Sequence, residues 1–316
     1  MFSGHIEIRE MNVPENTSKP VRILRANEKF RWPGGARVAV VFNIALEAWS
    51  DGEAPPIGPM GNVLKAGYFD SNAHSWASYG IIRGVPRLQR IADKNEIKTS
   101  VMTNGVIAQR NPQAIRDLVA AGHDVLAHSW GMDVIPVYLD DAAARANIER
   151  NTKALQDVTG ERPVGWISPR GTGSPVHPAM LAQAGYMWHG DCNDDDLPAI
   201  AEFDDGNGGV RRIVQIPLTM DVNDLPHSIR YGNQPDSLVE HFETALEGAV
   251  AVDDQPFLLD VTAHAHVYGR PAAAWVFEEM MDAARDCSDV WIGTRREIAD
   301  YTLKNADKMF EPGIVP

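Results

Sequence analysis

The chain has 316 residues, 44% of them hydrophobic and 23% charged, and its formal net charge is -14 at pH 7. This composition suits a globular protein with a substantial core. The excess of negative charge repels nucleic acid and anionic membranes, so it argues against both as partners and favours a small-molecule ligand. The only two cysteines, Cys192 and Cys287, have no metal-binding spacing, which argues against a disulfide framework or a zinc knuckle.

The first residues, MFSGHIEIREMN, lack the features of a secretory signal, and no apolar run reaches the roughly 20 residues that cross a bilayer. We therefore expect a cytoplasmic protein. Residues 1–35 contain three prolines and are expected to form an N-terminal arm, wrapped on the domain or on a neighbouring subunit. The rest is expected to form a barrel over residues 36–303, within a single catalytic domain spanning residues 1–316.

From about residue 36, short apolar runs alternate with amphipathic stretches. Strands are expected at residues 37–46, 98–103, 123–128, 165–168, 214–217, 257–262 and 290–292. Helices are expected at residues 85–95, 112–121, 140–159, 178–184, 238–248 and 272–286, with a short one near 295–303. Asp140 is placed to cap the third helix and Gly160 to end it. About seven such β/α units predict an α/β fold and a barrel rather than an open sheet.

A long stretch without periodicity, residues 48–72, follows the first of these strands and is rich in Gly and Pro. A loop of this length inside a compact domain usually serves as a lid or a binding loop.

Polar side chains recur where the expected strands end. Glu47 follows the first strand, His128 ends the third, Arg170 follows the fourth, and His264 and His266 follow the sixth. Each alone is more often a cap, a rim charge or a structural histidine. Because a parallel barrel gathers the carboxyl ends of its strands at one face, their convergence predicts a catalytic pocket made by Glu47, His128, Arg170 and His264.

Two acidic turns, NDDDLP at residues 193–198 and DVNDLP at 221–226, admit two interpretations. On their own they are typical Asx turns, and in the second interpretation they hydrogen-bond a polar substrate. Tryptophans near the strand ends are likewise either packing residues or pocket walls. The residues predicted to bind substrate are Trp49, Trp130, Asp194, Asp195, Asn223, Asp224 and His266.

Several segments together resemble the polysaccharide deacetylase family, and most closely its cytoplasmic allantoinase-like and cyclic-imide-hydrolase-like branch. They are WPGGARVAVVFNIALEAW, YGIIRGVPRLQRIADKNEIKTSVMTNG, GHDVLAHSW, GERPVGWISPRGTGSP, DCNDDDLP, DVNDLP, TAHAHVYGRP and VWIGTRREIADY. The resemblance runs from about Trp32 to Tyr301. It implies a distorted, seven-stranded (β/α) barrel and hydrolysis of a C–N bond in an amide, imide or ureide.

The resemblance also implies roles for single positions. By position, Ala45 falls on the family's catalytic base, Glu47 on its metal-holding carboxylate, His128 and Met132 on its metal-binding histidine pair, and His264 on its late general acid. Alanine cannot accept a proton, and a thioether is a poor ligand in an oxygen and nitrogen site. We therefore expect a site without a cofactor. A divalent metal such as zinc, held by Glu47 and His128, is the alternative.

The leading hypothesis is a hydrolase of a small, cyclic amide. Glu47, desolvated against Trp49 and Trp130, would have a raised pKa suited to a base, and His128 would position the water. His264 would be the acid, with His266 as the alternate, and Arg170 would stabilise the oxyanion.

The two rivals are a metal-dependent N-deacetylase of a sugar or other N-acyl compound and a non-catalytic ligand-binding barrel. The resemblance further implies a homo-oligomer, with a tetramer as its suggested size.

Overall fold

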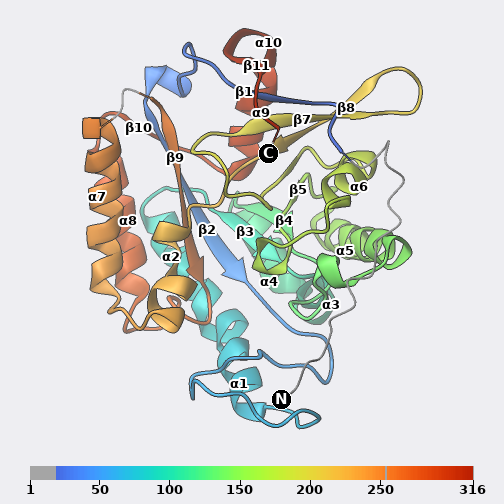
Figure 1. Ribbon diagram of the computed structural model, residues 1–316. Coiled ribbons are helices and arrows are strands. Elements are labelled where there is room, and N and C mark those ends of the chain that lie inside the picture. Colours follow the sequence, from blue (N-terminus) through green and yellow to red (C-terminus); the bar gives the residue numbers. More distant parts are fainter. Residues whose placement is uncertain (1–18, 253–254, 316) are drawn as a thin grey trace, which may run out of the picture.

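The structure is a computed structural model that describes residues 19–252 and 255–315, so the first 18 residues of the predicted arm lie outside it (Figure 1). Within the described residues, eleven strands form one sheet in the order β10-β2-β3-β4-β5-β6-β8-β7-β1-β11, with β9 paired to β2. The strand pairs β10-β2, β9-β2, β2-β3, β3-β4, β4-β5, β5-β6 and β6-β8 are parallel. The predicted α/β class with a mostly parallel sheet is confirmed.

The parallel strands are buried, except that β10 is partly exposed and the first half of β8 is exposed. They are β2 (Val38–Leu46), β3 (Ser100–Thr103), β4 (Asp124–Ala127), β5 (Gly165–Trp166), β6 (Trp188–His189), β8 (Val210–Gln215), β9 (Phe257–His264) and β10 (Val290–Ile292). Of these, β6 was not predicted from the sequence, because two residues are too few to show a period.

The helices follow the strands in alternation. In the described ranges they are α1 (Ser71–Tyr79), α2 (Val85–Lys94), α3 (Gly105–Arg110), α4 (Pro112–Ala120), α5 (Asp141–Thr159), α6 (His177–Gln183), α7 (Asp236–Val252), α8 (Ala274–Asp286), α9 (Arg295–Lys304) and α10 (Ala306–Met309). The Asp140 side chain accepts a hydrogen bond from Ala143 N and Gly160 has φ 81°, so both predicted ends of α5 are confirmed.

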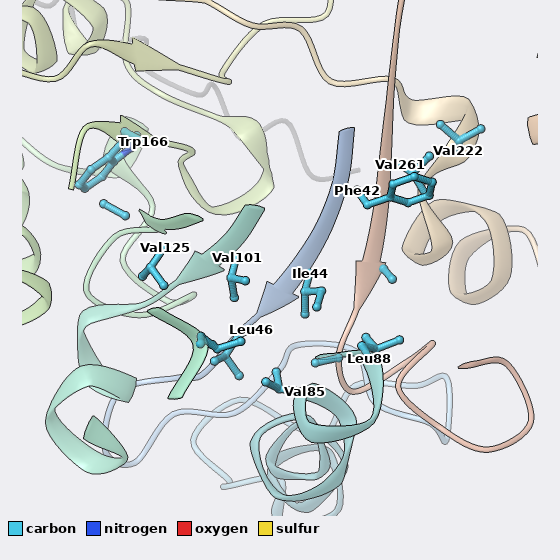
Figure 2. Packing of buried hydrophobic residues seen from close by; sticks show 14 of the residues in the cluster. Phe42, Ile44, Leu46, Val85, Leu88, Val101, Val125, Trp166, Val222 and Val261 are labelled. Atoms are coloured by element: carbon cyan, nitrogen blue, oxygen red, sulfur yellow. The ribbon is translucent and has the colours of Figure 1, made fainter. Parts of the chain in front are cut away.

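Strand β2 explains how the site is positioned. Its nine residues are all buried, and its side chains alternate between two hydrophobic clusters. Phe42 and Ile44 belong to the larger cluster, which packs against helices (Figure 2). Val41 and Ala45 belong to the second cluster, on the other face of the strand. Because the period of a strand is two, Glu47 continues the second series and comes after Ala45 on that face.

Three antiparallel strands extend the sheet beyond β8. They are β1 (Arg22–Ala26), β7 (Ala199–Asp204) and β11 (Phe310–Pro312), with β7 paired to β8, β1 to β7, and β11 to β1. Through β1, residues 22–26 of the predicted arm thus pair with strands β7 and β11 of the same chain. Between the segment after β8 and strand β9, the described residues show one isolated parallel bridge, Asn223 to Thr262.

No helix in residues 19–252 and 255–315 is both long and apolar enough to cross a membrane.

Candidate active site

Three parallel strands bring one carboxylate and two imidazoles together. Glu47 follows β2, His128 follows β4, and His264 ends β9. Glu47 Oε1 lies 3.4 Å from His264 Nε2 and 3.7 Å from His128 Nε2. All three side chains are at least nine-tenths buried. The predicted convergence of these residues at the carboxyl ends of the strands therefore holds in the structure.

His264 is held between two carboxylates. Its Nδ1–H donates to Asp224 Oδ1 at 2.6 Å, and its backbone N–H donates to Asp224 Oδ2 at 2.8 Å. Burial alone would lower the pKa of the His264 imidazole, but the charges of Asp224 and Glu47 outweigh burial and raise this pKa to about 10. His264 is therefore an imidazolium at neutral pH.

The same contacts correct the expected pKa of Glu47. Burial would raise it, but the positive charge on His264, which faces the carboxylate at 3.4 Å, holds the pKa well below the usual range of a carboxyl group. The prediction of a raised pKa is wrong, because the sequence shows that Glu47 is buried but not that a charged imidazole faces it. Glu47 is ionised at neutral pH.

His128 is fixed by its other ring nitrogen. Its Nδ1–H donates to the carbonyl of Ile167 at 2.6 Å, which leaves Nε2 facing Glu47 at 3.7 Å. Asn104 joins the two strand ends, since its Oδ1 accepts from Ala48 N at 2.9 Å and its Nδ2 donates to the His128 carbonyl. Sequence reasoning missed Asn104. Its position after an expected strand was the available signal.

His266 lies next to this cluster, among aromatic rings. Its ring meets Trp76 edge to face with centroids 4.4 Å apart, and Trp49 and His264 lie at 6.3 and 5.8 Å. Burial lowers the pKa of His266 to about 4, so this imidazole is neutral at physiological pH. Trp49, which is predicted to bind substrate, thus lies beside His266, and so does Trp76, which was not predicted as a site residue.

Two buried polar atoms near Glu47 have no hydrogen-bond partner among the described residues. They are His128 Nε2 and His266 Nδ1. Buried polar groups in folded proteins are nearly always hydrogen-bonded, so such atoms at adjacent positions are typical of a place that a ligand or water completes.

Four of the residues predicted to bind substrate have other partners. Asp194 and Asp195 form ion pairs with Arg25 of β1. The carbonyl of the next residue, Asp196, accepts a hydrogen bond from Leu258 N. Leu258 lies at the start of β9, six residues before His264. At the rise of a strand this is a separation of roughly 20 Å, so the structure does not bring this turn to the site.

The second acidic turn reaches the site in a different way from the one predicted. Asp224 is fully buried and binds His264 instead of facing a substrate. Asn223 Oδ1 accepts from Leu225 N at 3.1 Å, which is the local Asx turn of the alternative interpretation.

Trp130 does not shield Glu47. Its ring packs closely against Gly105 and carries the Arg150 guanidinium 3.3 Å from its centroid, within the cluster that faces the helices. The predicted place of Trp130 in the pocket wall is wrong.

Arg170 follows β5, but its side chain is exposed and no ion pair joins it to Glu47 within the described residues. Its backbone has φ 63°, and Ser129, directly after His128, has φ 61°. Such left-handed conformations in residues other than glycine cost energy and gather at functional sites. The structure therefore places Arg170 outside the buried cluster, in a constrained turn at the end of its strand.

The described donor atoms do not fit a catalytic zinc ion. Glu47 and the Nε2 of His128 are suitable ligands, and His128 has the oriented ring that metal-bound histidines show. His264 is not a third ligand, because both its ring nitrogens face carboxylates as proton donors. Met132 lies beside them, with its N–H on the Ala48 carbonyl, but offers only a thioether. No group of three or more His, Cys, Asp or Glu side chains in the described ranges has a metal-holding arrangement, whereas catalytic zinc takes three protein ligands.

A mostly parallel α/β sheet places a buried carboxylate and imidazoles at the carboxyl ends of its strands, where enzymes of this class carry their active sites. Residues 79–189 match the polysaccharide deacetylase family model, the family that the motifs of the chain resemble. The predicted enzyme class, a hydrolase acting on carbon–nitrogen bonds other than peptide bonds, is confirmed.

Known proteins similar to this chain span most of its length. PuuE allantoinase has a TM-score of 0.78 and 26% identity, covering 88% of this chain and 93% of its own. A structure described as a "probable polysaccharide deacetylase" from Pseudomonas aeruginosa PAO1 also has a TM-score of 0.78, with 27% identity over 86% of this chain and 93% of its own. The peptidoglycan deacetylase of Helicobacter pylori is 21% identical over 70% of this chain and 84% of its own.

Proposed function

We propose that the protein hydrolyses a C–N bond in a small cyclic amide, imide or ureide, with Glu47 as the base and His264 as the acid. The observation that carries the proposal is the buried series Asp224, His264 and Glu47, joined at 2.6 and 3.4 Å. Hydrolysis of an amide needs a group that takes a proton from water and a group that gives one to the leaving nitrogen. An ionised carboxylate facing an imidazolium supplies both in one place.

The reaction balances without an external proton donor. Water adds to the carbonyl carbon as Glu47 takes its proton, and the Nε2 proton of His264 passes to the nitrogen as the C–N bond breaks. The products are a carboxylic acid and an amine or amide. The proton on Glu47 then returns to His264, across the 3.4 Å that separate the two side chains.

The two proton transfers assist each other. The charge on His264 keeps Glu47 a weak base in the resting site. When His264 gives up its proton, that charge disappears and the basicity of Glu47 rises. The choice between the two late histidines falls on His264, because His266 is neutral and has no proton to give at physiological pH.

The remaining groups orient the reactants. The free Nε2 of His128 would accept a hydrogen bond from the attacking water. His266 and Trp49 would form the wall against which a small ring lies. Arg170 stays the proposed donor to the oxyanion, which requires its exposed side chain to turn inward to the carbonyl that is attacked.

A panel of succinimide, hydantoin, dihydrouracil and N-acetylglucosamine tests the proposal. We expect wild-type protein to hydrolyse a cyclic member and Glu47→Gln to lose about 10²- to 10⁴-fold in kcat/KM. Glu53→Gln, an exposed glutamate on the same connecting segment, is the matched control and should retain activity. Full activity in Glu47→Gln would remove Glu47 from its role.

The orientation of the His128 ring favours one alternative, a metal-dependent N-deacetylase. That enzyme would act on N-acetylglucosamine and lose activity with a chelator, whereas the proposed hydrolase would not respond to the chelator. Absence of turnover on every substrate, with retained binding of a cyclic imide, would instead favour the non-catalytic binding barrel.

The predicted single domain, homo-oligomer and cytoplasmic location accompany this proposal. Light scattering of the purified protein measures the oligomer, for which a tetramer is the expected size.

A further inference from the structure

The arginine of the motif TAHAHVYGRP, Arg270, has no part in the chemistry proposed above, yet it lies four residues after His266 and is partly buried. Its Nε donates to the His266 carbonyl at 2.9 Å, and its Nη2 donates to the Trp76 carbonyl at 3.3 Å. Its guanidinium carbon lies 4.1 Å from the centroid of the Tyr79 ring. One planar group thus joins the segment that carries the site histidines to helix α1.

The two residues that Arg270 joins through their carbonyls also meet through their side chains. The rings of His266 and Trp76 stand edge to face at an interplanar angle of 87°, with centroids 4.4 Å apart. Such pairs have a preferred geometry, and a small backbone shift on either side changes it. The contact forms the wall of the site next to Glu47 and His264.

We propose that Arg270 is a positioning residue, which sets His266 against Trp76 and so determines how tightly this wall binds a substrate. The inference rests on the proposed function, since it concerns the same site. His266 Nδ1 is buried without a partner in the described part of the chain, so a small rotation of its ring changes which ligand atom it meets.

The backbone near Arg270 stays in place without it. The segment between the site histidines packs against the π-helical turn η2 (Gly80–Gly84) so closely that a Cβ on Gly84 would lie 1.9 Å from the Ala265 carbonyl oxygen. A Cβ on Gly269 would lie 2.1 Å from the same oxygen. Arg87 adds hydrogen bonds to the Gly269 carbonyl and to Tyr79 Oη. We therefore expect Arg270→Ala to fold, and to lose only the fine orientation of the two rings.

The test compares Arg270→Ala and Arg270→Lys with Arg285→Ala. Arg285 is an exposed arginine on α8 that binds Asn95 and Asp282, outside the site. On the cyclic substrate turned over best by wild type, Arg270→Ala should raise KM about tenfold while kcat changes less than about threefold, because the wall binds and the proton-transfer groups remain. Added methylguanidinium should restore part of the lost affinity of Arg270→Ala. Arg270→Lys should bind substrate more weakly than wild type, because lysine lacks the planar guanidinium fork.

A readout independent of turnover is the ring resonance of His266 in protein labelled with ¹³C-histidine, assigned by its absence in His266→Gln. The resonance should move in Arg270→Ala and stay in Arg285→Ala. An unmoved resonance in folded Arg270→Ala, an unchanged KM, or a fall in kcat alone would overturn the proposal. If wild type hydrolyses none of the panel, the proposed function fails, and the resonance alone decides whether Arg270 positions His266.

Discussion

Replacing Asp224 with asparagine tests the central charge arrangement of the site. The Asp224 carboxylate is buried and contacts His264 Nδ1 at 2.6 Å. The rise in the pKa of His264 from 6.5 to about 10 corresponds to roughly 5 kcal/mol in favour of the imidazolium, shared between Asp224 and Glu47. Asparagine keeps the size and one acceptor oxygen but removes the charge.

An opposite charge in contact accounts for about 1 to 3 units of pKa, so His264 should titrate near pH 7 to 9 in Asp224→Asn. Because the proposed mechanism needs protonated His264, kcat/KM should fall above about pH 10 in wild type and already above about pH 7 to 9 in the variant. The assay is kcat/KM on a cyclic imide as a function of pH. Asp221→Asn, an exposed aspartate three residues earlier, is the matched control. An unmoved alkaline limb in folded Asp224→Asn would refute the reasoning.

Three further outcomes are expected. Met132→His would add a third nitrogen or oxygen ligand to Glu47 and His128. We expect this variant to bind zinc at least about tenfold more tightly than wild type in calorimetry. Equal zinc affinities of the two proteins would contradict the site described. Folding raises the pKa of His264, so the protonated ring stabilises the folded state below about pH 6.5, and this stabilisation is lost as pH rises to about 10. The melting temperature should therefore fall more over this pH range in wild type than in His264→Gln. Phe42→Ala should cost about 3 to 5 kcal/mol in the free energy of unfolding by urea, since Phe42 is fully buried, and a cost below 1 kcal/mol would show a core that repacks.

The sequence was sufficient to predict the strands that carry the site, because these are buried on both faces. Strand β2 is a continuous run of apolar residues broken only by Asn43, which is why its course and the place of Glu47 at its end could be predicted. Strands β1 and β7 were not predicted. Each is short and carries charges, and the Gly-rich turn at residues 205–209, which joins β7 to β8, was the hairpin signal that could have revealed β7.

The convergence of Glu47, His128 and His264 followed from topology, whereas the partner of each side chain did not. The two acidic turns look alike in sequence, yet Asp195 pairs with Arg25 and Asp224 with His264. Contacts between residues far apart in the chain decide this, and local composition does not record them. The sign of the pKa shift of Glu47 depends on the same kind of contact.

The close approach of Gly84 and Gly269 to the Ala265 carbonyl has a consequence for redesign of the site. There the segment that carries His264 and His266 packs directly against backbone atoms. A larger residue at Gly84 or Gly269 would therefore displace the catalytic histidines instead of changing the shape of the substrate site. The segment after Glu47 contacts the site through Trp49, and further along it Met60, Val63 and Tyr68 are exposed. New substrate preference should therefore be sought by varying that segment, with the glycines left unchanged.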